Sequence, residues 1–121
     1  MSNAFKTGEK VIIQIDYELN SDVEDANVGF GIVRVDGLDV YASNTRIDRV
    51  DKYSLSKKGT INIVINQFMV LSGHYHLDVA IEDENDEVID FWREAVEFDV
   101  FSTISDVGIM RIEHNWEINN E

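Results

Sequence analysis

Histidine and aspartate side chains alternate along one apolar segment of the chain, where they could act together on a ligand. Within residues 73–81, His74, His76 and Asp78 fall on every second position. Residues two apart share one face of a β-strand, so these three side chains are expected on the same face. Two imidazoles at this spacing can bind one metal ion, but the remaining histidine, His114, lies far along the chain. The pattern favours a solvent-exposed strand face, and we predict no metal and no other cofactor.

The abundant carboxylates suggest two further kinds of site. Glycoside hydrolysis needs two carboxyl groups across a cleft, and Asp78 and Asp90 could approach one another on neighbouring strands. Nothing in the sequence indicates that either is buried, so we predict that the protein is not an enzyme. The acidic turn at residues 82–87 offers oxygen ligands for calcium, but it lacks the glycine and the fixed spacing of a calcium loop. Turns of this composition are usually structural.

An aromatic side chain beside hydrogen-bonding groups would suit a sugar. If the acidic turn pairs Val79 with Phe91, then Asp78 lies opposite Trp92 on the outer face of the strands. An indole can stack on the apolar face of a pyranose while carboxylates and imidazoles bind the hydroxyls. Alternatively, Trp92 packs under a loop or in a dimer contact, and a one-residue change of register would bury it. The predicted ligand-binding residues are Trp92, Asp78, His76 and Asp90, with Arg34 as a contact for an anionic substituent.

These side chains require a sheet, and alternation of apolar and polar residues dominates the sequence. Asp36-Gly37 is a strong hairpin signal, and the glycine pair Gly29 and Gly31 is interpreted as a bulge or a close backbone approach. About eight short strands separated by turns predict an all-β, immunoglobulin-like antiparallel β-sandwich. The expected strands cover residues 11–19, 27–35, 40–42, 60–66, 73–81, 88–93, 95–101 and 108–112.

Length, charge and composition limit the class of protein. The 121 residues suit one domain, which we place at residues 5–121 because Met1–Ala4 looks like an expression scar. The absence of cysteine excludes disulfides and thiolate metal sites. A net charge of −14 disfavours nucleic acid and anionic membranes as partners. No apolar run approaches the roughly 18 residues of a membrane-spanning helix, so direct membrane insertion is not expected.

Several segments together resemble the C-terminal domain of Wzt-type proteins, the ATP-binding subunits of ABC exporters for O-antigen polysaccharides. The resemblance covers nearly the whole chain in order, and no single motif is diagnostic. It is carried by Gly8-Glu9-Lys10, Val28–Ile32, Asp36-Gly37, Val40-Tyr41, Asn44-Thr45, Gly73–Ile81, Asp90, Phe98-Asp99-Val100 and the ending from Gly108-Ile109 to His114-Asn115-Trp116.

The resemblance implies a domain that recognises an exported glycan before transport. It also implies a homodimer in which the last strand, residues 108–112, is exchanged between protomers, and other transporter subunits as partners. The chain has no phosphate loop and should itself bind no ATP. The expected location is cytoplasmic, at the inner membrane through the transporter. The sequence therefore predicts a non-catalytic carbohydrate-binding module. The alternative is a structural or protein-interaction sandwich that mediates assembly.

Overall fold

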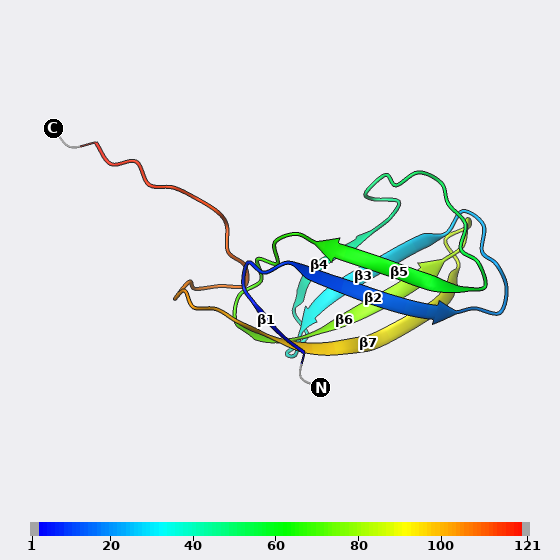
Figure 1. Ribbon diagram of the computed structural model, residues 1–121, viewed down its shortest axis with the longest axis horizontal. Coiled ribbons are helices and arrows are strands. Elements are labelled where there is room, and N and C mark those ends of the chain that lie inside the picture. Colours follow the sequence, from blue (N-terminus) through cyan, green and yellow to red (C-terminus); the bar gives the residue numbers. More distant parts are fainter. Residues whose placement is uncertain (1–2, 120–121) are drawn as a thin grey trace.

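The computed structural model describes residues 3–119, which form seven β-strands in two layers (Figure 1). No helix occurs among these residues, and the all-β sandwich is confirmed. No segment in this range forms a helix long and apolar enough to cross a membrane. The strands are β1 Ala4–Lys6, β2 Val11–Glu18, β3 Asn27–Arg34, β4 Asp39–Asn44, β5 Lys58–Ile65, β6 Gly73–Glu82 and β7 Val88–Phe101.

The larger layer is a five-stranded sheet with the order β1-β7-β6-β3-β4, and β2 and β5 form a two-stranded sheet above it. All pairs are antiparallel except β1 and β7, so the sheet departs from the purely antiparallel arrangement expected. Ala4, which sequence analysis assigned to an expression scar, is the first residue of β1 and pairs with Asp99.

Strict alternation along β6 builds the centre of the core. Tyr75, Leu77, Val79 and Ile81 are between 0% and 2% exposed, whereas the residues between them face outward. Burial of each such side chain contributes about 1.5–3 kcal/mol, so this face contributes much of the stability of the fold. The inward positions predicted for this strand are confirmed.

Loops complete the core at positions that periodicity does not reveal. Phe68, Val70 and Leu71 lie between β5 and β6 and are 3–4% exposed. Val23 and Leu55 are also buried and form an isolated antiparallel bridge between two loops. These side chains were not predicted, because an irregular backbone gives no regular spacing from which burial can be inferred.

The β3–β4 hairpin follows the expected turn chemistry. Gly37 has a φ of +93°, a left-handed conformation that glycine adopts without strain. Its amide donates to the carbonyl of Arg34 at 2.8 Å, and the amide of Arg34 donates to the carbonyl of Leu38 at 2.9 Å. The hairpin predicted at Asp36-Gly37 is confirmed.

The C-terminal third differs from expectation in two ways. The predicted strands at residues 88–93 and 95–101 form one strand, β7. The strand predicted at residues 108–112 is reduced to an isolated bridge between Met110 and Val70, and the rest of the chain extends away from the sandwich (Figure 1). With β1, which was not predicted, residues 3–119 form seven strands where about eight were expected.

Candidate functional site

The register between β6 and β7 decides which aromatic side chain faces outward. Next to the turn, Glu82 pairs with Val88, but Ile81 pairs with Asp90, so Ile89 is an extra residue in β7. Beyond this bulge Val79 pairs with Trp92, not with Phe91 as predicted. A shift of one residue exchanges the faces of a strand, so the predicted pairing of Asp78 with Trp92 was wrong.

The two neighbouring aromatic residues consequently lie on opposite faces. Trp92 points toward the interior, is half-buried, and packs against both hydrophobic clusters of the core. The register change considered from the sequence therefore turns this indole inward, where it is half-buried. Phe91 pairs with Ala80 on the outer face and is 53% exposed. The exposed ring in this region is a phenyl group.

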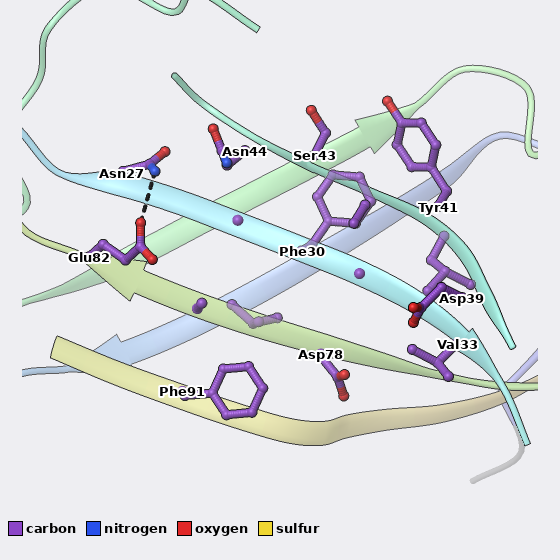
Figure 2. A pocket seen from close by; sticks show the side chains of 16 residues that line it. Asn27, Phe30, Val33, Asp39, Tyr41, Ser43, Asn44, Asp78, Glu82 and Phe91 are labelled. Atoms are coloured by element: carbon purple, nitrogen blue, oxygen red, sulfur yellow. Dashed lines mark hydrogen bonds between the residues drawn. The ribbon is translucent and has the colours of Figure 1, made fainter. Parts of the chain in front are cut away.

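The outer face around Phe91 is hollowed into a shallow cavity of about 280 Å³, which we call the trough (Figure 2). Its floor consists of small residues, because Gly29 and Gly31 on β3 lie between Ala80 on β6 and Ala42 on β4. Small-molecule sites have volumes of roughly 300–1,000 Å³. At about 280 Å³ the trough lies at the lower edge of this range, so it could hold only a short stretch of ligand.

The two glycines of the floor differ in what the fold requires of them. A Cβ atom on Gly29 would lie 3.2 Å from the Cβ of Asn44, a tight contact that confirms the predicted close approach. A Cβ on Gly31 would meet only the Cβ of Ala42 at 3.8 Å and the carbonyl of Tyr41 at 3.9 Å. These are ordinary van der Waals distances. Packing therefore does not demand glycine at position 31, and what this glycine provides is open space.

Polar side chains stand around this floor. Asn27 and Glu82 occupy one end, where the amide Nδ2 of Asn27 donates to Oε1 of Glu82 at 3.1 Å (Figure 2). Asp39 and Asp78 lie toward the other end, near Val33. The trough thus combines an exposed aromatic ring with carboxylate and amide groups.

Asp78 also holds the backbone of β7 in place. Its Oδ1 accepts the amide of Glu94 at 2.7 Å, and Glu94 has a φ of +53° in an irregular stretch that separates Trp92 from Val96 in the pairing. The Nε2 of His76 lies 3.5 Å from the same oxygen. Asp78 therefore lines the trough as predicted on the outer face. His76 adjoins it but is not part of the lining.

The other two predicted residues lie elsewhere. Asp90 pairs with Ile81 and faces a separate cavity of about 610 Å³ beside the acidic loop at residues 18–24. Arg34 donates from Nε and Nη2 to the two carboxylate oxygens of Asp36, both at 2.8 Å. Neither lines the trough. Asp90 lies on the same face of β7 as Trp92, and Arg34 is held at the hairpin by Asp36.

The ion pair between Arg34 and Asp36 shifts the pKa of both side chains. The hydrogen bonds from Arg34 lower the pKa of Asp36 to about 2, and the same hydrogen bonds raise the pKa of Arg34. Burial raises the pKa of Tyr75, whose hydroxyl donates to the carbonyl of Leu71 at 2.8 Å. None of these groups lines the trough.

The segments considered for metal ions have structural contacts instead. His74 contacts Asp99 on the neighbouring strand, and no group of three or more His, Asp or Glu side chains within residues 3–119 could hold an ion. In the acidic turn, Oδ1 of Asp83 accepts the amides of Asn85 at 2.8 Å and Glu87 at 3.0 Å. The turn carboxylate therefore stabilises the turn itself.

Phe91 and the small-residue floor were missed from the sequence, although a signal for Phe91 was present. One face of β7 is formed by residues at even positions, namely Trp92, Val96, Phe98 and Val100. The last two are buried. Extending the alternation of residues 96–100 back to 92 would have placed Trp92 inside and Phe91 outside. The assumption of a break between two strands at residue 94 concealed this.

The fold and the trough define a two-layer β-sandwich domain with a hollowed outer sheet face. The profile of the Wzt C-terminal domain family matches residues 1–112, and the chain belongs to this family. Among solved structures it is similar to the structure described as the C-terminal domain of wzt, with a TM-score of 0.79 and 16% sequence identity. The match covers 96% of this chain and 74% of that chain. A search of curated protein sequences gives no significant match.

Proposed function

We propose that this domain is a non-catalytic carbohydrate-binding module and that the trough is its binding site. The proposal rests on two features of the trough taken together. The Phe91 ring is 53% exposed, and the floor is open at Gly31, a position where packing does not require glycine. An exposed phenyl ring flanking a side-chain-free floor is an apolar platform beside a space where a flat ligand could lie. A pyranose has this shape, with an apolar face and a polar rim.

The polar rim of the trough supplies partners for sugar hydroxyls. Oδ1 of Asn44 accepts the amide of Ile47 at 2.8 Å, which leaves Nδ2 without a partner among residues 3–119. The hydrogen bonds within this range use one carboxylate oxygen of Asp78 and one of Glu82. Hydroxyl groups both donate and accept, so they can satisfy an amide donor and carboxylate acceptors together.

Family membership gives the biological setting of the proposal. The Wzt C-terminal domain family links the chain to ABC transporters of O-antigen polysaccharides. We infer that the trough binds an O-antigen-type polysaccharide and that the domain is held at the cytoplasmic side of the inner membrane by transporter subunits. In this role the domain binds the glycan and performs no reaction on it.

A glycan array followed by titration tests the proposal. The protein is first applied to an array of bacterial polysaccharides, and the strongest ligand is then titrated into wild type and Phe91→Ala by calorimetry. Removal of an aromatic anchor should weaken binding by about 1–3 kcal/mol. The matched control is Phe101→Ala, which removes another phenylalanine of β7 that is 51% exposed but outside the trough.

The control separates a site effect from a general loss of apolar surface. Binding should be unchanged in Phe101→Ala, because this residue lies at the opposite end of β7 beside β1. Equal weakening in both variants, or no saturable binding to any glycan, would remove the trough as a carbohydrate site.

A second function, assembly, is favoured by the C-terminal segment. Val107, Ile112, Trp116 and Ile118 are 73–99% exposed, and the segment extends away from the sandwich (Figure 1). Apolar side chains in such numbers are unfavourable in water and mark interaction surfaces. We infer that this segment packs against a second copy of the chain, as the predicted exchange of the last strand implies.

Sedimentation equilibrium tests assembly independently of glycan binding. The wild type should be a dimer, and the double variant Trp116→Ser with Ile118→Ser should shift the equilibrium toward monomer by at least about tenfold, since two large apolar contacts are lost. A monomeric wild type, or a dimer equally stable in the variant, would contradict this role for the segment.

A further inference from the structure

Within residues 3–119, the lining of the trough includes three carboxylates and no lysine or arginine. Building on the proposed function, we propose that it selects glycan units that carry no negative charge and accepts neutral or amino-bearing sugars. This selectivity goes beyond carbohydrate binding, because a trough of the same shape with a lysine or arginine on its rim would favour the opposite class.

Three carboxylates line the trough. Asp39, Asp78 and Glu82 are part of its lining, and no lysine or arginine within residues 3–119 is. The whole chain adds to this field with a net charge of −14. The side chain of Asp78 is only 21% exposed, so a charge brought close to it is less screened than at an open surface.

Outside the lining, Arg93 is exposed two residues from Phe91 on β7, and Nε2 of His76 lies 3.5 Å from Oδ1 of Asp78. Two other cations, Arg34 and Arg46, are held by partners elsewhere. Arg34 is bound to both carboxylate oxygens of Asp36. Arg46 contacts Asp86 and donates from Nη2 to the carbonyls of Asp25 at 3.0 Å and Asp83 at 3.1 Å. Moving either guanidinium toward the trough would break several hydrogen bonds, so neither is available to balance an anionic ligand. The structure thus gives no support for Arg34 as the contact for an anionic substituent.

The hydrogen-bonding capacity of the rim points to the same ligand class. Carboxylates only accept hydrogen bonds, and a phosphate or a second carboxylate brings mainly further acceptors. Hydroxyl, N-acetyl and ammonium groups bring donors that match the free oxygens of Asp78 and Glu82. An ammonium group would also be attracted to the face of the exposed Phe91 ring. The rim is therefore complementary to donor-rich, uncharged or positively charged sugars.

Paired glycans on one array test the inference. Each neutral oligosaccharide is printed beside its sulfated, phosphorylated or uronic-acid counterpart and beside its free-amine counterpart. For the wild type, each anionic member should bind about fivefold or more weakly than its neutral partner, as expected for like charges a few ångströms apart in water. The difference should shrink at 0.5 M salt, because the trough is open to solvent.

Amide variants localise the effect to the trough. The triple variant Asp39→Asn, Asp78→Asn, Glu82→Gln keeps a carbonyl acceptor at each position, so the hydrogen bonds from Glu94 and Asn27 can persist. The anionic members should gain affinity in this variant relative to their neutral partners. The matched control is Asp51→Asn, Glu84→Gln, Glu87→Gln, which changes the net charge equally through exposed residues outside the trough and should retain the wild-type preference.

The outcomes separate the two proposals. Wild-type binding to anionic glycans that equals or exceeds binding to their neutral partners overturns the charge selectivity while leaving carbohydrate binding intact. A preference lost equally in both triple variants also overturns it, because the effect would then belong to the net charge and not to the trough. Absence of binding to every glycan overturns the proposed function and the selectivity with it.

Discussion

The two faces of the five-stranded sheet are built from the same strands but carry very different side chains. On the inner face of β6, Leu77, Val79 and Ile81 are 0–1% exposed. On the outer face of the same strand, Asp78 and Ala80 border a floor that includes Gly31. Stability is concentrated on one face, and the other is left free of the large side chains that would fill it. A central strand gains little from an interior glycine, so this outer face is shaped for something other than packing.

Phe91 and Trp92 show the same division within two consecutive residues. The indole packs against both core clusters, whereas the phenyl ring is half exposed over the trough. Truncating one should therefore affect folding and truncating the other should affect binding. The following changes test this separation, beginning with the largest expected effect.

Trp92→Ala should lower the free energy of unfolding by about 2–4 kcal/mol, because it removes a large, partly buried side chain from the core. Phe91→Ala should change it by no more than about 0.5 kcal/mol, as expected for an exposed position. Urea denaturation followed by circular dichroism measures both. Equal losses in the two variants would show that the faces are not divided as described.

Gly31→Ala should weaken glycan binding without lowering stability, the reverse of what is expected for Trp92→Ala. The added methyl group meets only ordinary contacts, and an alanine strand residue is less costly than glycine by up to about 1 kcal/mol, so stability should be unchanged or slightly higher. Glycan binding should weaken by about 1–2 kcal/mol because the methyl group occupies the floor. Calorimetric titration and urea denaturation of one preparation give both values. Undiminished affinity would mean that the ligand does not use the floor.

Asp78 contributes both to the binding site and to stability, since it lines the trough and accepts a hydrogen bond from the amide of Glu94. Asp78→Ala should cost about 1 kcal/mol of stability through the lost hydrogen bond, and Asp78→Asn should cost less because it keeps an acceptor. Faster hydrogen exchange at the Glu94 amide in the alanine variant would identify the cause. The same exchange rate in both variants would contradict it.

The smallest effect is expected at Asp36, which lies in the β3–β4 hairpin and is not part of the trough lining. Its pKa in the folded protein is about 2, below the ordinary value of 3.8. The pair with Arg34 should therefore stabilise the fold fully above about pH 4 and lose this contribution as the pH falls through about 2. The melting temperature of wild type should exceed that of Asp36→Asn at pH 5, and the gap should close near pH 2. A gap independent of pH would exclude the ion pair as its source.

Much of this organisation could be predicted from alternation alone. The expected positions of the strands that became β2 to β6 agree with the structure to within two residues at every end, and the inward residues of β6 are all buried. The family resemblance is confirmed by the profile match over residues 1–112. The strand positions and the buried face of β6 follow from hydrophobic periodicity, which is a property of the sequence itself.

The site was harder to predict because it depends on irregular backbone. Ile89 is an ordinary β-branched residue, and nothing in its type announces the bulge that turns Phe91 outward. Glu94 adopts a positive φ that glutamate rarely shows, held by the hydrogen bond that its amide donates to Asp78 on the neighbouring strand β6. Such local shifts arise from tertiary contacts. Sequence reasoning therefore identified the correct sheet face at Asp78 but the wrong aromatic partner.

Amide chemical-shift mapping tests the central claim most directly. A neutral oligosaccharide selected on the array is added to ¹⁵N-labelled protein, and shifts are followed at Gly29, Gly31, Asp78 and Phe91. Binding in the trough predicts saturable shifts at these amides, and little change at Ile12 and Val64, which are exposed on the two-stranded sheet. Saturable shifts confined to that second sheet or to the C-terminal segment, with the trough amides unmoved, would contradict the account.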